Sequence, residues 1–321
     1  MREPIRSLVI SLPAPTNYVE DLQRAFPEVT ITTADPDNLT DALLEADAVV
    51  AWRIPEEAIQ NARNLKWIHR GAAGVEDLVT PTLRDSGIIL TNSSGVHATN
   101  MSEHVLACML AFARRLPKLI DMQREREWNG KRVIGVFELS GQTVALAGLG
   151  DIGQAVATRA KALGMNTIGI RRNPALPRPD DVDMLMSSER LHEALESANH
   201  VVNSLPLTSS TRGMFDAAAF EAMRPGTYFY NVGRGGTVDQ QALIAALERG
   251  RLAGAALDVT DPEPLPKDSP LWDMPNVIIT AHTAGKTPQM WSRVFKLVEV
   301  NLRRYNAGEP MINVVDFDAG Y

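Results

Sequence analysis

The chain has little cysteine, no long apolar run and no excess of positive charge, and each shortage excludes a class of protein. One of its 321 residues is cysteine, which leaves no intramolecular disulfide and no cysteine-based zinc site. The longest apolar run, residues 105–113, is far shorter than the roughly 20 residues that span a bilayer. Acidic residues outnumber basic ones by 39 to 32, a balance that argues against a nucleic-acid partner.

What remains is the composition of an ordinary globular protein. Hydrophobic residues make up 45% and charged residues 22% of the chain, which excludes disorder of the whole. At roughly 100–200 residues per domain, the length predicts two domains. The apolar stretch near the N-terminus is too short and too interrupted for a secretory signal peptide. We therefore expect a cytoplasmic protein without a membrane partner.

Short apolar runs alternate with runs of helical period along the first hundred residues, a pattern typical of a doubly wound parallel sheet. A long helix follows, for which Asn100 is the expected N-cap and Glu103 its capping-box partner. Its expected apolar face runs from Val105 through Met109 and Phe112 to Leu116. The strands predicted before it cover residues 7–12, 29–33, 47–52, 65–69 and 87–90.

A second alternating series begins near residue 143. It contains six predicted strands, the number expected of a dinucleotide-binding doubly wound sheet. A last helix is predicted over residues 289–305. The six strands cover residues 143–147, 166–170, 200–205, 227–232, 254–259 and 277–280.

Gly148, Gly150 and Gly153 form a G-x-G-x-x-G sequence between a predicted strand and a predicted helix over residues 154–163. This context predicts a dinucleotide-binding turn. The glycines let the backbone approach a pyrophosphate, and the helix N-terminus offers N–H groups to it. A glycine-rich turn without a ligand is the alternative interpretation.

The charge at the end of the next strand distinguishes NAD from NADP. An acidic residue there would bind the adenosine ribose hydroxyls, whereas this chain has Arg171 and Arg172. A guanidinium group can bind a 2′-phosphate through two hydrogen bonds. The sequence therefore favours NADP, with NAD still possible, and two solvated arginines are the alternative.

Arg234, Glu263 and His282 each follow a predicted strand, at the sheet edge where ligands bind. Arginine can bind a carboxylate, histidine can supply a proton near neutral pH, and glutamate can orient the imidazole. The spacing alone also fits unrelated surface ion pairs. No metal-binding motif is visible, Arg70 is expected at the surface, and no role is assigned to His69, His97, His104, His192 or His200.

These stretches together resemble the D-isomer-specific 2-hydroxyacid dehydrogenase family over nearly the whole chain. The resemblance rests on motifs in the family's order, among them GAAGVED at 71–77, NSSGV at 92–96, NVGRGGTVD at 231–239, PEPL at 262–265 and AHTAG at 281–285. Within the family, the chain is most similar to NADP-dependent glyoxylate/hydroxypyruvate reductases, because of the arginine pair and of Trp52.

The resemblance implies a fold and an assembly. A Rossmann cofactor domain, residues 98–285, would be inserted into a flavodoxin-like substrate domain formed by residues 1–97 and 286–321. Substrate would bind in the cleft of such an enzyme, and the protein would be a homodimer.

The resemblance also implies a reaction, the reduction of a small 2-oxo acid to the D-2-hydroxy acid. His282 would be the general acid/base and Glu263 its partner. The substrate would contact Arg234, Trp52 and the backbone of Ala73, Gly74 and Val75. The implied cofactor contacts are Gly148, Gly150, Asp151, Ile152, Gly153, Arg171, Arg172, Leu205, Pro206, Val232, Asp258, His282, Ala284 and Gly285.

Two departures and two alternatives accompany this resemblance. Ala281 stands where the family most often has proline, and Asp151 where many members have arginine. Glu263, rather than glutamine, argues against the formate dehydrogenase branch. The alternatives are an NAD-linked D-3-phosphoglycerate-type dehydrogenase and a non-catalytic dinucleotide-sensing module.

Overall fold

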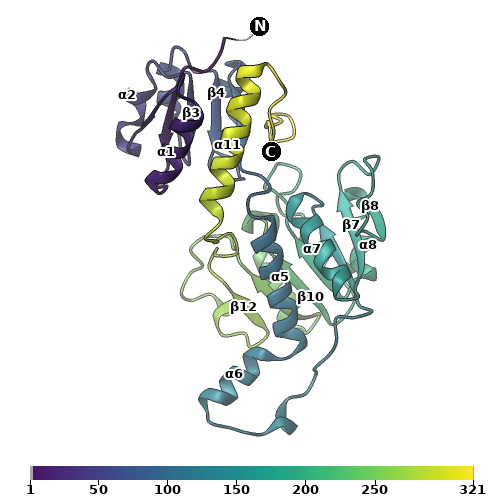
Figure 1. Ribbon diagram of the computed structural model, residues 1–321. Helices are drawn as coiled ribbons and strands as arrows, with labels where there is room; N and C mark the ends of the chain where they lie inside the picture. Colours follow the sequence, from purple (N-terminus) through teal and green to yellow (C-terminus); the bar gives the residue numbers. More distant parts are fainter. Residues whose placement is uncertain (1–2, 321) are drawn as a thin grey trace. The chain divides into compact units, whose positions relative to one another are not determined.

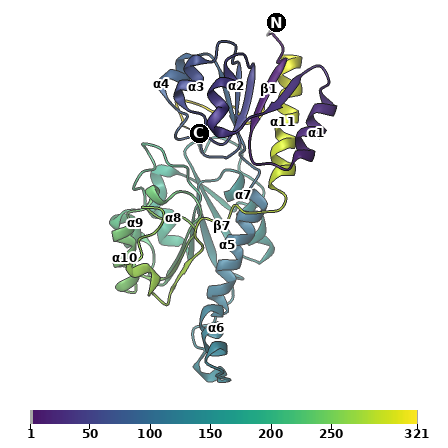
Figure 2. The same cartoon turned by 90° about the vertical axis from the view of Figure 1, so that its left-hand side faces the viewer.

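A computed structural model of the protein describes residues 3–320, which form two compact α/β units (Figures 1 and 2). The first unit combines the described parts of Met1–Val96 and Thr287–Tyr321, and the second unit is His97–Lys286. Each unit is built around one parallel sheet, so the predicted α/β fold with two doubly wound sheets is confirmed.

The first unit has a five-stranded sheet in the order β2-β1-β3-β4-β5. Side chains alternate along its strands, so Leu8 and Ile10 face one apolar cluster and Val9 the other. The strands are β1 (Ser7–Ser11), β2 (Thr30–Thr33), β3 (Ala48–Ala51), β4 (Trp67–Arg70) and β5 (Ile89–Asn92).

Helices cover both faces of this sheet. On one face lie α1 (Thr16–Ala25) and α11 (Met290–Ala307), where the rings of Tyr18 and Phe295 stack with centroids 5.5 Å apart. The C-terminal segment thus completes a unit that the N-terminal segment begins. The short helices α2 (Leu39–Leu43), α3 (Glu56–Asn61) and α4 (Pro81–Asp85) cover the other face.

The second unit has a seven-stranded sheet in the order β12-β11-β10-β9-β6-β7-β8. From β6 the chain first proceeds to β8 at one edge and then returns to β9, on the other side of β6. This reversal between β6 and β9 is the switch point at which open α/β sheets bind ligands. The strands are β6 (Thr143–Ala147), β7 (Asn166–Arg171), β8 (Met184–Ser187), β9 (His200–Asn203), β10 (Thr227–Asn231), β11 (Leu252–Leu257) and β12 (Val277–Ile279).

Two layers of helices enclose the second sheet. One apolar cluster joins it to α5 (Ala98–Ala113) and α7 (Asp151–Ala162). Another joins it to α8 (Leu191–Ser197), α9 (Ala217–Ala222) and α10 (Gln240–Glu248). A further helix, α6 (Leu116–Arg124), follows α5 (Figure 1). Within residues 3–320, no helix combines the length and the apolar character needed to cross a bilayer.

Three details differ from the sequence prediction. The second sheet has seven strands instead of six, because β8 is a short edge strand whose Met184 is 51% exposed, so it lacks a buried apolar run. Helix α5 begins at Ala98 with His97 as its N-cap, so Asn100 is not the cap. It also ends before Leu116, since Arg115 adopts a left-handed φ of 56° and α6 begins there.

Candidate active site

The glycine-rich turn follows β6 at the switch point of the second sheet. Gly148 has φ +92°, a left-handed conformation that favours glycine. A Cβ on Gly153 would lie 2.0 Å from the carbonyl oxygen of Gly148, so helix and turn pack too closely for any side chain. The hydroxyl of Ser204, just after β9, donates to the same carbonyl at 3.0 Å. Backbone conformation and packing within the protein therefore explain why residues 148 and 153 are glycine.

Gly150 has a different environment. A Cβ built there would meet no atom within 4 Å, so the protein itself leaves this space open. Gly150 is the N-cap of α7 and makes no side-chain capping bond, and Asp151 and Ile152 begin the helix. Open space before the N–H groups of a helix N-terminus suits a phosphate group. These residues fit the pyrophosphate of a dinucleotide.

The arginine pair lies at the end of β7, and its two members differ in environment. Arg171 turns back onto the following loop, where its Nη2 donates to the carbonyls of Leu176 and Pro177. The Nε of Arg171 is buried and has no hydrogen-bond partner among residues 3–320. Arg172 is exposed. Arg171 thus braces the loop, and Arg172 is the more accessible guanidinium.

The loop after β10 contacts the loops of both neighbouring strands. A Cβ on Gly233 would lie 2.6 Å from the carbonyl oxygen of Leu205, after β9. A Cβ on Gly235 would lie 1.8 Å from the carbonyl oxygen of Thr260, after β11. Arg234 stands between these two glycines, and its Nη1 donates to the carbonyl of Gly233 at 2.9 Å.

This packing gathers several of the predicted cofactor contacts. Leu205 and Pro206 follow β9, and Val232 follows the adjacent β10. The buried amide of Asn203 donates to Oδ1 of Asn231 at 3.0 Å, which joins the ends of these strands. The three predicted residues therefore lie on neighbouring loops of one sheet edge.

Glu263 and His282 form a hydrogen-bonded pair. Nδ1 of His282 lies 2.8 Å from Oε2 of Glu263, and the backbone N–H of Thr260 donates to Oε1 at 3.1 Å. An ionised carboxylate only accepts hydrogen bonds, so Nδ1 carries a proton and Nε2 is left for another partner. The side chains are 56% and 38% exposed, respectively, which leaves the imidazole accessible.

The turn at His282 is held by Asp258. Ala281 and His282 both have positive φ, 47° and 55°, a conformation that costs a residue with a Cβ roughly 1–2 kcal/mol. The N–H of His282 donates to the carbonyl of Asp258 at 2.6 Å. The Asp258 carboxylate accepts the N–H groups of Thr283 at 2.8 Å and Ala284 at 3.1 Å, and Gly285 follows.

The loop predicted to bind a substrate carboxylate belongs to the first unit. Ala73, Gly74 and Val75 follow β4, and the side-chain amide of Asn92 donates to the carbonyl of Ala73 at 2.9 Å. The side chain of Arg70 is only 11% exposed and pairs with Asp77 at 3.0 Å. The expected surface position of Arg70 is therefore wrong. Its ion pair with Asp77 connects the two ends of the loop over residues 71–76.

Trp52 lies at the end of β3 in the same unit. It is 39% exposed and stacks on Trp291 of α11, with ring centroids 5.7 Å apart. A Cβ on Gly71 would lie 2.7 Å from Cδ1 of Trp52, so the ring lies directly against the start of the carboxylate loop. The sequence gives no sign of Trp291 here, because it is remote along the chain.

Two other histidines are unsuited to proton donation. Burial lowers the pKa of His69 to about 3 and that of His200 to about 4. Both rings instead join buried hydrogen bonds, His69 with Thr91 and Ser93, and His200 with Tyr230 and Gln142. They are neutral at physiological pH in the folded protein, and both are buried, whereas the ring of His282 is accessible.

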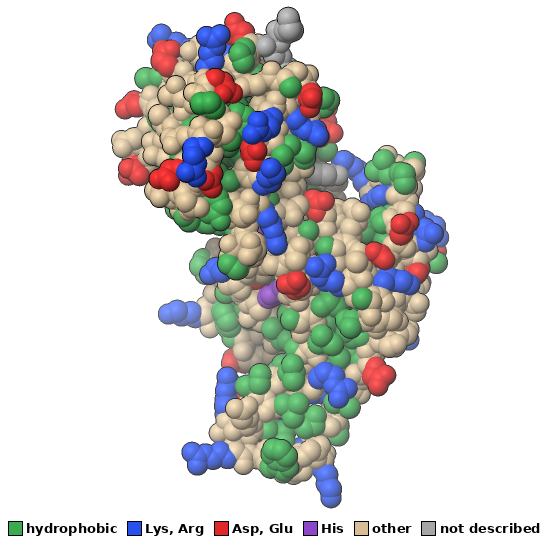
Figure 3. All heavy atoms as spheres, viewed as in Figure 1, with side chains coloured by type: hydrophobic (Ala, Val, Ile, Leu, Met, Phe, Trp, Pro, Cys, Tyr) green, Lys and Arg blue, Asp and Glu red, His purple; other side chains and the backbone are tan. Residues whose placement is uncertain are grey.

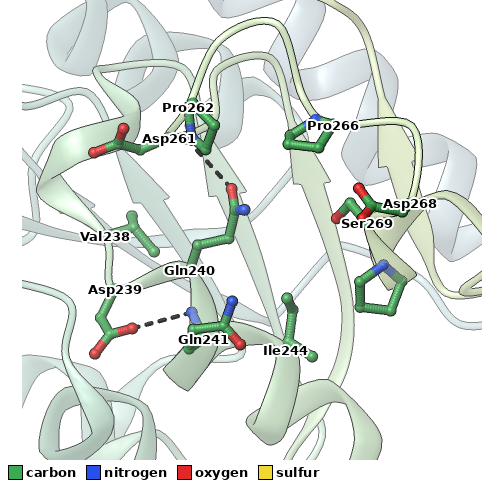
Figure 4. A pocket seen from close by; sticks show the side chains of 11 residues that line it. Val238, Asp239, Gln240, Gln241, Ile244, Asp261, Pro262, Pro266, Asp268 and Ser269 are labelled. Atoms are coloured by element: carbon green, nitrogen blue, oxygen red, sulfur yellow. Dashed lines mark hydrogen bonds between the residues drawn. The ribbon is translucent and has the colours of Figure 1, made fainter.

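A cavity of about 440 Å³ lies behind the loop that carries Glu263 (Figure 4). It is bounded by the start of α10, by Asp261 and Pro262, and by Pro266 and residues 268–270, and none of the predicted site residues lines it. Oε1 of Gln240 accepts the N–H of Asp261 at 3.3 Å across one wall. This hydrogen bond connects the start of α10 to the loop that carries Glu263.

Known proteins resemble the chain in sequence and in structure. Residues 106–284 match the NAD binding domain of the D-isomer specific 2-hydroxyacid dehydrogenases. D-3-phosphoglycerate dehydrogenase of Methanocaldococcus jannaschii is 33% identical over 294 residues, covering 90% of this chain and 55% of that protein. The chain spans about half the length of the curated phosphoglycerate dehydrogenases it matches first.

Two crystal structures match along the full length. A D-isomer specific 2-hydroxyacid dehydrogenase from Xanthobacter autotrophicus Py2, in complex with NADPH and MES, has a TM-score of 0.86 and 32% identity and covers 99% of this chain and 100% of its own. The NADPH-dependent glyoxylate/hydroxypyruvate reductase of Sinorhizobium meliloti, in complex with NADP and sulfate, has a TM-score of 0.84 and 32% identity, covering 98% and 99%.

The chain therefore belongs to the D-isomer specific 2-hydroxyacid dehydrogenase family. Its members are oxidoreductases, and the matching domain is one that binds a nicotinamide dinucleotide. The resemblance inferred from the motifs is thereby confirmed. The roles of the individual side chains in binding and catalysis remain predictions.

The close contact at Gly235 leads to a first prediction. Gly235→Ala should destabilise the protein by about 1–3 kcal/mol, because the new Cβ must push away the backbone of Thr260. Urea unfolding measures the change. Gly130→Ala is the matched control, since a Cβ there meets nothing within 4 Å. Equal stability of the two variants would contradict the contact.

Proposed function

We propose that this protein reduces a small 2-oxo acid of the glyoxylate or hydroxypyruvate class to the D-2-hydroxy acid, with NADPH as the preferred reductant. The observation that carries the proposal is the hydrogen-bonded pair of Glu263 and His282, which gives an oriented and accessible imidazole to the same unit that holds the glycine-rich turn. The name and full-length match of the Sinorhizobium meliloti reductase support the substrate class.

The residues of the chain would divide the work as follows. A bound nicotinamide supplies the hydride that reduces the carbonyl carbon. Arg234 would bind the substrate carboxylate. Glu263 holds Nδ1–H of His282, so that the protonated ring donates its Nε2 proton to the developing alkoxide. Before the transfer, Glu263 stabilises the positive charge of the His282 ring. After the transfer, the ring is neutral.

The preference for NADPH rests on the end of β7. Two guanidinium groups follow the glycine-rich turn where an acidic residue would repel a 2′-phosphate. Arg172 is the group that we assign to the phosphate, since it is the more exposed of the two at the end of β7. Arg171 would then hold the loop in the shape that presents Arg172.

An NAD-linked D-3-phosphoglycerate-type dehydrogenase is the second candidate. The phosphoglycerate dehydrogenase of Methanocaldococcus jannaschii favours it at 33% identity, although this chain covers 55% of that protein. The arginine pair opposes it. Turnover of phosphohydroxypyruvate with NADH in preference to glyoxylate with NADPH would select this candidate over the first.

We also propose that two copies of the chain form a homodimer through an apolar surface at α6. This surface, the α6 patch, lies on the second unit, where Figure 3 shows hydrophobic side chains at the surface, and it includes Trp128 at 102% exposure and Ile134 at 75%. A patch of this kind typically marks a protein interface. Its members are Leu116, Leu119, Ile120, Trp128, Ile134 and Val136.

Sedimentation equilibrium tests the dimer. The native chain should sediment with twice its mass of 35.1 kDa, and Trp128→Ser should shift the equilibrium toward the monomer. Leu176→Ser, at another exposed apolar residue of the second unit, is the control. A monomeric native protein would contradict the proposal.

His282→Ala tests the central role. Turnover of glyoxylate with NADPH should fall about 100-fold to 10,000-fold, the range that general acid catalysis contributes. NADPH affinity, measured by fluorescence titration, should change little, because the glycine-rich turn is untouched. Turnover near the native rate would refute His282 as the proton donor.

Arginine variants test the cofactor preference. Arg172→Ala should raise KM for NADPH by about 10-fold to 100-fold and leave KM for NADH nearly unchanged, since a charge-assisted hydrogen bond to phosphate is lost. The double variant Arg171→Ala with Arg172→Ala should raise KM for NADPH by at least as much. Arg178→Ala is the control for damage to the loop. Arg178 supports the same loop by donating to the carbonyl of Asp183 at 2.8 Å. Equal losses with both cofactors would show that neither arginine binds a 2′-phosphate.

A further inference from the structure

Helix α5 presents polar side chains to the loop that carries His282. Asn100 and His104 are one helical turn apart and therefore share a face. Nδ2 of Asn100 donates to the carbonyl of Ala284 at 2.7 Å. Nε2 of His104 lies 3.1 Å from the hydroxyl of Thr280. The helix thus contacts this loop on both sides of His282.

The contact of His104 continues to Asp258. The hydroxyl of Thr280 donates to Oδ1 of Asp258 at 2.7 Å. A hydroxyl has one hydrogen, so the Thr280 oxygen must accept from His104, and Nε2 of His104 must carry a hydrogen. The order of donors runs from His104 through Thr280 to the carboxylate.

Asp258 is the point where this chain of hydrogen bonds reaches the catalytic turn. It is 4% exposed, and its oxygens accept the N–H groups of Thr283 and Ala284 as well as the Thr280 hydroxyl. Its influence extends to α5, since burial and then the charge of Asp258 raise the pKa of the Cys108 thiol to about 11. Helix, carboxylate and turn form one hydrogen-bonded network around the buried carboxylate of Asp258.

The turn needs such support. Ala281 and His282 both adopt left-handed backbone conformations, which side chains with a Cβ rarely do. Residues held in this way persist only where surrounding contacts fix them. Removing a contact should let the turn relax and move the imidazole away from Glu263.

We propose that His104 and Asn100 are positioning residues for His282. His104 acts through Thr280 and Asp258, and Asn100 acts through the carbonyl of Ala284. This inference rests on the proposed function of His282 as the proton donor. The hydrogen bonds of Asn100 to Ala284 and of His104 to Thr280 act on the backbone and supports of the turn that carries His282, so their effect is on the placement of the ring.

Steady-state kinetics with glyoxylate and NADPH test the proposal. His104→Ala should lower kcat by about 10-fold to 100-fold, the cost of a small misplacement of a reacting group, while KM for glyoxylate changes little. His104→Gln should recover most of the rate, because its amide can donate to Thr280. His192→Gln, on the exposed surface of α8, is the matched control and should behave as the native protein.

A double-mutant cycle separates the network from general damage. Thr280→Val interrupts the same chain of hydrogen bonds, so His104→Ala with Thr280→Val should lose no more rate than Thr280→Val alone. Fully additive losses would overturn the proposal. A native kcat in both His104→Ala and Asn100→Ala, alongside an inactive His282→Ala, would also overturn it and leave the proposed function intact.

The ring resonances of His282 give a readout that needs no turnover. They are identified by nuclear magnetic resonance of ¹⁵N-histidine-labelled protein, through their absence in His282→Ala. His104→Ala and Asn100→Ala should shift or broaden the Nδ1 signal, and His192→Gln should not. Unchanged Nδ1 signals in both variants would refute the positioning role. Because this readout needs no substrate, it tests the positioning role even if the native protein does not turn over glyoxylate.

Discussion

The candidate site depends on the contact between the loop after β10 and its two neighbours. Gly233 and Gly235 bring the backbone of this loop against Leu205 and Thr260, closer than any side chain would allow. Arg234 stands between them, and the N–H of Thr260 fixes the carboxylate of Glu263. An arginine and a glutamate from two different strands are thereby set at fixed places on one sheet edge. The placement of both therefore depends on the absence of two Cβ atoms.

A second constraint sets the orientation of the His282 ring. His282 lies on a left-handed turn that the Asp258 carboxylate stabilises by accepting the N–H of Thr283. The carboxylate of Glu263 accepts the Nδ1–H of the His282 ring. Backbone strain and side-chain pairing thus leave Nε2 as the available atom of an accessible ring. His69 and His200, in contrast, are buried, and burial lowers the pKa of each ring, whereas the ring of His282 is accessible and held by Glu263.

Much of the fold and several site residues follow from local sequence, and the rest depends on distant packing. The alternation of strands and helices and the turn from Gly148 to Gly153 are local patterns, so they could be predicted. The edge strand β8 has no buried run to reveal it. Asn100 has the side chain of a helix cap, yet it binds a carbonyl nearly two hundred residues away, and the stacking of Trp291 on Trp52 is equally remote in sequence.

The most direct test of the account is a crossed initial-rate assay of the native protein with four 2-oxo acids and two cofactors. The acids are glyoxylate, hydroxypyruvate, phosphohydroxypyruvate and phenylpyruvate, each offered with NADPH and with NADH. The account predicts the highest kcat/KM for glyoxylate or hydroxypyruvate with NADPH. A preference for NADH, or for the phosphorylated or phenyl-bearing acid, would contradict it, as would binding of NADPH without turnover of any acid.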